Sequence, residues 1–234
     1  MLYALSHPLA LLGLVLGFVA AVTLHGAVQA FVATRTGDRR PRAEGRVSLD
    51  TRRHLDPFGC VAAGLAGPGW VRPVEVGSPV FRGRAPWRPV LVLATGPLAS
   101  GLLGLGLLVG ARAAGASEFG IRALPLSELL HGRGQGAAAG ASLLLLEAGA
   151  AALAVALLAL VPLPPLDAGR ALFSVAPRSQ GWQRARHWLI EQNIGLVAVL
   201  VLLIIPIAGE RPLLLVLLDT LARPLLDAIA GLAL

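Results

Sequence analysis

Long apolar segments alternate with short arginine-rich segments along the whole chain. An apolar run of about 18 residues or more predicts a membrane-spanning helix, because about 20 helical residues cross the hydrocarbon core of a bilayer. Several runs exceed this length, and the pattern predicts about five spans, over residues 9–32, 90–111, 137–161, 194–208 and 212–232. We therefore predict an all-α polytopic membrane protein, in which residues 1–234 form a single integral-membrane domain.

A shorter apolar segment follows the first predicted span. Residues 57–74 are interrupted by glycine and proline, and their apolar core of about 14 residues is too short to cross the bilayer as a straight helix. Because basic segments lie on both sides, we expect a re-entrant or interfacial segment with a short β-like part that returns to the same face. Non-helical backbone at this depth needs protein or water to satisfy its hydrogen bonds, which predicts a cavity near that face.

Composition and charge support a membrane protein. Hydrophobic residues make up 56% of the chain and the mean hydropathy is +0.73, too apolar for the surface of a water-soluble domain. All 20 basic residues are arginines, and they lie mainly between the spans, with seven in residues 35–54. This distribution predicts cytoplasmic loops of a bacterial plasma-membrane protein and a lipid bilayer as partner, and it does not favour nucleic acid. The single cysteine, Cys60, excludes an internal disulfide and a cysteine-based zinc site.

Three polar residues are expected near the cytoplasmic ends of the spans. His25 and Gln29 share one face of the first span, and Asp167 follows the third span. Two helical positions four residues apart with a distant carboxylate form the geometry of a zinc site. Other interpretations remain open: His25 and Gln29 as hydrogen-bonding partners of neighbouring helices, and Asp167 as the cap of a turn.

Five stretches, in this order, resemble the site-2 protease family of intramembrane zinc metalloproteases in its compact prokaryotic form. Singly each motif is weak, but the series covers most of the chain. The stretches are "LHGAVQAFVATRTGD" (24–38), "GRVSLDTRRHLDPFG" (45–59), "GWVRPVEV" (69–76), "GPLAS" (96–100) and "PLPPLDAGR" (162–170).

The resemblance also shows where this chain departs from the family. In the family, two histidines and an aspartate bind zinc, and a glutamate after the first histidine activates water. His25 and Asp167 occupy two ligand positions, whereas Gly26 replaces the glutamate and Gln29 replaces the second histidine. Two further differences lie near Asp167. Ala159 stands where the family often has asparagine, and Ala168 stands where the family has glycine.

These departures predict a protein without catalytic activity. An amide carbonyl is a poor zinc ligand, and the loss of a general base costs a factor of about 10² to 10⁴ in rate. The resemblance therefore implies a pseudoprotease that binds or shields a transmembrane segment of a partner, with no cofactor, or with zinc if the residual site holds it. Two alternatives remain: an active protease in which a loop carboxylate serves as base, and a small transporter or structural protein. The candidate loop carboxylates are Glu44, Asp50, Asp56 and Glu75.

Further polar residues stand outside this set. Glu147 lies 15 residues before Pro162, which is about 22 Å along a helix and places it toward the extracytoplasmic end. It is expected to be a paired intramembrane charge or a residue near the outer surface. His54 and Asp56 belong to the loop motif and are expected to hold that loop together.

Overall fold

The computed structural model describes residues 1–75, 87–177, 179–206 and 210–232, and its regular structure there is helical. The predicted all-α fold class is confirmed. The expected β-like part is reduced to one isolated antiparallel bridge between Leu55 and Val71. Arg82, Arg84 and Arg178, and the last residues of the predicted span 194–208, lie outside the described residues.

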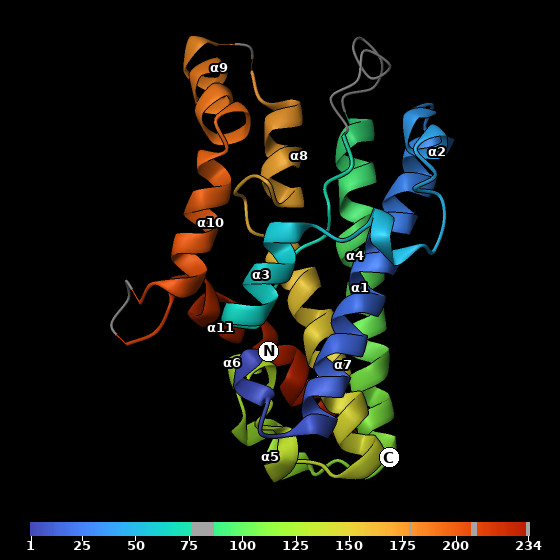
Figure 1. The fold of residues 1–234 in the computed structure, drawn as a ribbon, viewed down its shortest axis with the longest axis vertical. Coiled ribbons are helices and arrows are strands. Elements are labelled where there is room, and N and C mark those ends of the chain that lie inside the picture. Colours follow the sequence, from blue (N-terminus) through green and yellow to red (C-terminus); the bar gives the residue numbers. More distant parts are fainter. Residues whose placement is uncertain (76–86, 178, 207–209, 233–234) are drawn as a thin grey trace.

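Three long helices form the centre of the molecule and run side by side (Figure 1). They are α1 (Pro8–Arg35), α4 (Trp87–Ala113) and α7 (Gly140–Ala159), and each is long and apolar enough to cross a membrane. In α7, 83% of the spanning window is buried, against 50% in α1 and 33% in α4. α7 is therefore the central helix, and α1 and α4 shield it.

Glycines allow these helices to approach closely. A Cβ added at Gly17 of α1 would lie 2.2 Å from the Ala148 carbonyl oxygen of α7. A Cβ at Gly104 of α4 would lie 2.7 Å from the Leu153 backbone nitrogen. Small residues at such contacts are typical of helix packing within membranes, where backbones come into direct contact.

The C-terminal part contains the fourth and fifth predicted spans. α10 (Ile194–Ile204) can form a fourth span only together with the helical segment Gln180–Glu191, from which it is bent by 66°. α11 (Leu213–Ala230), predicted as the fifth span, carries three charged residues and is not among the candidate spans. Asp219 of α11 accepts hydrogen bonds of 2.7 Å from the backbone nitrogen and the hydroxyl of Ser127. The described residues thus contain three candidate spans, or up to four, and a fifth span stays a prediction.

Short helices connect these elements. The segment predicted as re-entrant contains α3 (Pro57–Ala66), which Asp56 caps by accepting a hydrogen bond of 2.8 Å from the Gly59 backbone nitrogen. Because Leu55 pairs with Val71, this segment ends next to its own start; its depth in a bilayer stays a prediction. The remaining short helices are η1 (Leu2–Ala4), α2 (Arg40–Ala43), η2 (Thr51–Arg53), α5 (Glu118–Ala123), α6 (Leu126–Leu130), η4 (Gly134–Gly136), α8 (Asp167–Val175), α9 (Gln180–Arg186) and the π-helical turn η5 (His187–Glu191).

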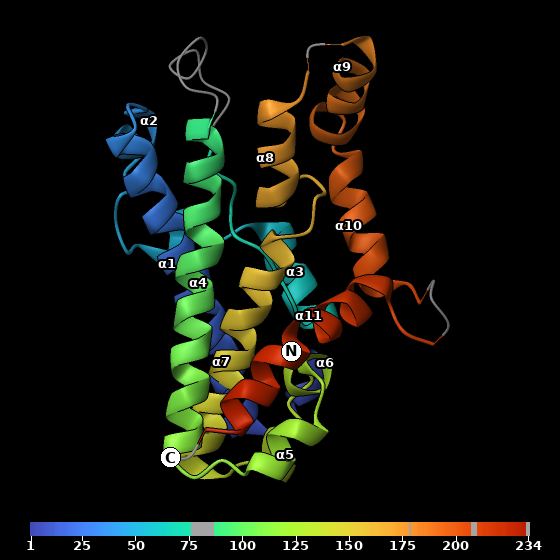
Figure 2. The same ribbon diagram turned by 180° about the vertical axis from the view of Figure 1, so that it is seen from behind.

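The two ends of the bundle carry different elements (Figure 2). One end, uppermost in both ribbon views, holds α2, the start of α4, α8 and α9. The opposite end holds α5 and α6. The arginine-rich segment 35–54 therefore begins at the same end as the segment that follows α7.

Candidate functional site

The fold brings His25 and Asp167 into direct contact although 142 positions separate them in the sequence. The His25 Nε2 atom lies 2.7 Å from the Asp167 Oδ2 atom, and the His25 Nδ1 atom lies 3.1 Å from the Ser100 Oγ atom. His25 and Ser100 have no exposed surface and Asp167 has 4%. The three side chains come from α1, α4 and α8, so this network joins three helices. Whether His25 and Asp167 bind a metal stays a prediction.

The chain after α7 explains why Asp167 reaches His25. α7 ends at Ala159, and the proline-rich residues 160–166 interrupt the helix before α8 begins at Asp167. Leu166 before it is extended, with φ −66° and ψ 155°, which turns the chain at this point. A carboxylate in the first turn of a helix is also favoured by the helix dipole. Asp167 is therefore favoured in the first turn of α8, although no side-chain hydrogen bond caps this helix.

Gly96 and Ser100 are site residues that sequence reasoning did not single out. A Cβ at Gly96 would lie 2.2 Å from the His25 Nε2 atom and 2.6 Å from the Gln29 Nε2 atom. The backbone of α4 thus passes directly against both side chains, and only glycine leaves room for them. The available signal was the stretch "GPLAS", which begins with Gly96 and ends with Ser100.

Gln29 is attached to α4 by its amide nitrogen. This nitrogen donates a hydrogen bond of 3.2 Å to the Leu93 carbonyl oxygen, while the Gln29 Oε1 atom is buried without a partner among the described residues. The side chain is fully buried. Its observed contact is the one expected of a hydrogen-bonding residue between packed helices.

His54 fills the space beside Gly26. A Cβ at Gly26 would lie 2.3 Å from the His54 Nδ1 atom. The His54 ring is fully buried, and its Nε2 atom lies 2.9 Å from the Ser48 carbonyl oxygen. A carbonyl only accepts, so Nε2 carries the proton. Burial lowers the pKa of His54 below its ordinary value of 6.5, which keeps the ring neutral, with the Nδ1 lone pair facing Gly26.

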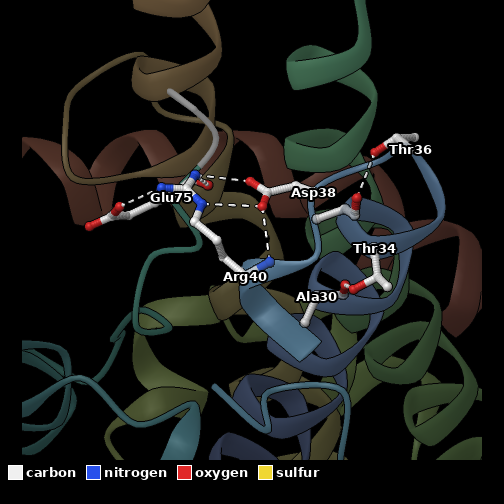
Figure 3. Close-up of polar contacts among 7 residues, drawn as sticks. Ala30, Thr34, Thr36, Asp38, Arg40 and Glu75 are labelled. Carbon is white, nitrogen blue, oxygen red and sulfur yellow. Dashed lines mark hydrogen bonds and ion pairs between the residues drawn. The ribbon is translucent and has the colours of Figure 1, made fainter. Parts of the chain in front are cut away.

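Three of the four loop carboxylates considered as a replacement base, Asp50, Asp56 and Glu75, have side-chain partners of their own. Asp56 caps α3, and Asp50 accepts a hydrogen bond of 3.2 Å from Arg53. Glu75 lies 3.4 Å from Arg40, which also contacts Asp38 at 2.9 Å (Figure 3). No described carboxylate other than Asp167 forms a hydrogen bond or ion pair with His25.

Glu147 is buried at a different place in the bundle. Its Oε1 atom accepts a hydrogen bond of 2.9 Å from the Gly134 backbone nitrogen, and its Oε2 atom has no partner among the described residues. It packs against Gly13 of α1. Gly13 precedes His25 by 12 residues on the same helix, which is about 18 Å. Glu147 is therefore not part of the His25 site.

The residues around His25 do not fit a zinc site. In the described ranges, no group of three histidine, cysteine, aspartate or glutamate side chains is placed to hold a metal ion. His25 and Asp167 satisfy one another directly, and the cavity beside them measures about 10 Å³, roughly the room of one water molecule. Protein zinc sites need at least three strong ligands. The contacts of His25 with Ser100 and Asp167 hold α1, α4 and α8 together.

The fold and the site together define a polytopic helical membrane protein with a buried histidine–aspartate pair between its helices. The chain is 30% identical over 209 residues to "Putative zinc metalloprotease YwhC" of Bacillus subtilis (strain 168), covering 88% of this chain and 86% of the relative. It therefore belongs to the site-2 protease-like family of membrane proteins. No family model matches the chain. No solved structure matches it either.

Proposed function

We propose that this chain is a pseudoprotease of its family: a membrane protein that keeps the fold, lacks peptidase activity, and binds or shields a transmembrane segment of a partner. The observation that carries the proposal is the pairing of Gly26 with His54. The position after His25 has no side chain, and a buried imidazole occupies the adjacent space. A glutamate there would have to displace a ring that is held by the Ser48 carbonyl.

The contacts of His25 support a structural role for the retained residues. In a metal site, the Nε2 lone pair and the carboxylate would both face the ion. Here the two atoms form a hydrogen bond of 2.7 Å with one another, and Ser100 occupies the other ring nitrogen. Both ring nitrogens and one carboxylate oxygen therefore have partners without any ion. A buried polar network that is satisfied in this way stabilises and orients the helices that contribute to it.

The proposed partner follows from the position of the site. The network lies within the helical bundle, and the outer faces of α1 and α4 expose large apolar side chains, including Leu12 at 48%, Leu16 at 49% and Leu102 at 70%. Surfaces of this kind contact lipid or the apolar helices of other membrane proteins. We propose that the arginine-rich end faces the cytoplasm of a bacterial plasma membrane, because arginines concentrate in the segments at that end.

A cleavage assay tests the proposal. The protein, purified in detergent and reconstituted in liposomes, is incubated with a panel of model transmembrane substrates. We expect no cleavage above that of the His25→Ala/Asp167→Ala double variant. Cleavage that is stopped by a zinc chelator and lost in that variant would overturn the proposal.

A second candidate function is supported by the His54 ring itself. Its unprotonated Nδ1 atom is buried, lacks a partner among the described residues, and faces the position of the missing glutamate. A neutral imidazole with a free lone pair is a suitable general base. In this version the protein is an active peptidase with a rearranged site. His54→Ala would then abolish cleavage. His54→Gln, which keeps the bulk and a hydrogen bond, would be inactive as well. Cleavage unaffected by either change would exclude this function.

A further inference from the structure

A large basic cavity lies beside the His25 site at the arginine-rich end of the molecule. Its volume is about 570 Å³, within the range of roughly 300 to 1,000 Å³ that is typical of small-molecule sites. Its walls come from the segment 72–75, from residues around the start of α8, and from η5 and α10. Four arginines and two carboxylates line it: Arg40, Arg72, Arg170, Arg186, Asp56 and Glu75.

The carboxylates do not neutralise this cavity. Arg40 is the arginine that pairs with Glu75, and it also contacts Asp38 (Figure 3). Asp56 keeps its negative charge as the cap of α3, so two carboxylates stand against four arginines. Ion pairs of the other three arginines are absent from the described part of the chain. The cavity therefore has an excess of positive charge.

Arg170 lines this cavity, and one nitrogen of its guanidinium group has no partner among the described residues. This nitrogen, Nη1, is buried. Burial lowers the pKa of Arg170, and Asp167 and Glu75 only partly oppose this effect. Burial likewise lowers the pKa of nearby Arg46; Glu44 opposes this effect, and Arg72 and Arg170 add to it. A buried guanidinium with a free N–H group is costly unless a ligand accepts from it.

The opposite wall of the cavity is apolar. Leu189 and Ile190 of η5 and Leu196 of α10 line it. α10 continues away from the cavity with exposed apolar side chains, including Val197 at 55% and Ile204 at 42%. A ligand that satisfies both walls needs an anionic group at one end and hydrocarbon at the other.

We propose that this cavity binds the phosphate headgroup of an anionic phospholipid. The Arg170 Nη1 atom donates to a phosphate oxygen, Arg72 and Arg186 contribute at the exposed rim, and the acyl chains follow Leu189, Ile190 and Leu196 onto the surface of α10. Guanidinium groups match phosphate oxygens through paired N–H donors. Basic pockets between membrane helices on the cytoplasmic side bind such headgroups. The proposal does not depend on whether the protein cleaves peptides.

Native mass spectrometry of the full chain, purified in a non-ionic detergent, tests the proposal. The probes are phosphatidylglycerol, phosphatidylcholine and inorganic phosphate, each titrated separately. We expect one phosphatidylglycerol to be retained at concentrations at which phosphatidylcholine is not, and to raise the melting temperature. Arg170→Gln should weaken this binding by about 10-fold or more, the loss expected for one charge-assisted hydrogen bond. Arg170→Lys should show an intermediate loss, because it keeps the charge and loses the paired donors.

Arg122→Gln is the matched control. It removes the same charge in α5 at the opposite end of the molecule and should leave binding unchanged. If Arg170→Gln does not fold, Arg186→Gln at the exposed rim should still weaken binding by several-fold. Equal retention of the two lipids would overturn the proposal. Stabilisation by inorganic phosphate or by an acidic peptide would also overturn the proposal if phosphatidylglycerol did not compete with that ligand.

Discussion

The His25 site and the arginine-lined cavity are neighbours, and they differ in volume and in charge. Beside His25 the space is about 10 Å³ and the ring nitrogens are both paired within the protein. In the cavity beyond Asp167 the space is about 570 Å³, and a buried nitrogen of Arg170 has no partner among the described residues. Only three positions of α8 separate Asp167 from Arg170. The closed His25–Asp167 pair holds helices together, whereas an open cavity lined by four arginines and two carboxylates has room for an anionic ligand.

The largest effect is expected at Gly96, where α4 passes against the closed His25 site. Gly96→Ala places a Cβ 2.2 Å from the His25 Nε2 atom, so the helices must separate or His25 must leave Asp167. We expect a loss of about 1–3 kcal/mol or more in the free energy of unfolding, measured by denaturation in detergent.

Gly106→Ala in the same helix provides the matched control. Nothing lies within 4 Å of a Cβ at this position. Alanine should therefore leave stability unchanged or raise it by about 0.5–1 kcal/mol, because glycine is the poorer helix former. Equal effects at the two glycines would mean that the close contact between α4 and His25 is wrong.

The His25–Asp167 pair is expected to contribute to stability without metal. Asp167→Ala leaves a buried ring nitrogen without its partner, which costs about 1–3 kcal/mol. In a double-mutant cycle with His25→Ala, the coupling between the two changes should be about 0.5–3 kcal/mol in the presence of a chelator. Unfolding measured with and without the chelator checks this. A coupling that vanishes when metal is removed would show that an ion, rather than the direct hydrogen bond, joins the two residues.

The fit between Gly26 and His54 predicts a smaller effect. Gly26→Ala brings a Cβ to within 2.3 Å of the His54 Nδ1 atom, so the strain should exceed the gain of about 0.5–1 kcal/mol that alanine normally brings to a helix. Adding His54→Ala should relieve the strain at position 26. The readout is non-additivity of the melting temperatures; additive effects would show that the two positions are not in contact.

The smallest effect concerns pH. Burial lowers the pKa of His54 in the folded protein below its ordinary value of 6.5. The unfolded chain then binds a proton that the folded chain does not, so the contribution of neutral His54 is complete above about pH 6.5 and is lost as the pH falls through the folded-state pKa. The melting temperature of the wild type should therefore fall more between pH 7.5 and 5.5 than that of His54→Gln. Parallel pH profiles would argue against a buried neutral ring.

Much of the fold could be predicted from the sequence because hydropathy reports directly on burial in a bilayer. The helices around α1, α4 and α7 follow long apolar runs, and their predicted bounds lie within a few residues of those observed. The C-terminal helix α11 was predicted as a span because its apolar content is high. Its three charged residues place it outside the candidate spans, and Asp219 is used to hold α6.

The site could be predicted only in part. The motifs placed His25 and Asp167 at equivalent depth, and the structure joins them at 2.7 Å. His54 was assigned to its loop, because nothing in a linear pattern shows that a loop side chain enters the space beside a glycine of another helix. Ser100, Gly96 and the arginine-lined cavity were missed for the same reason, since each depends on how distant segments pack.

Zinc content shows whether His25 and Asp167 hold a metal ion. The protein is purified from cells grown with added zinc, without chelators, and metal per chain is measured by mass spectrometry beside the His25→Ala variant. If His25 holds no zinc, we expect far less than one zinc per chain and no difference between the two proteins. One zinc per chain that disappears with His25→Ala would contradict it.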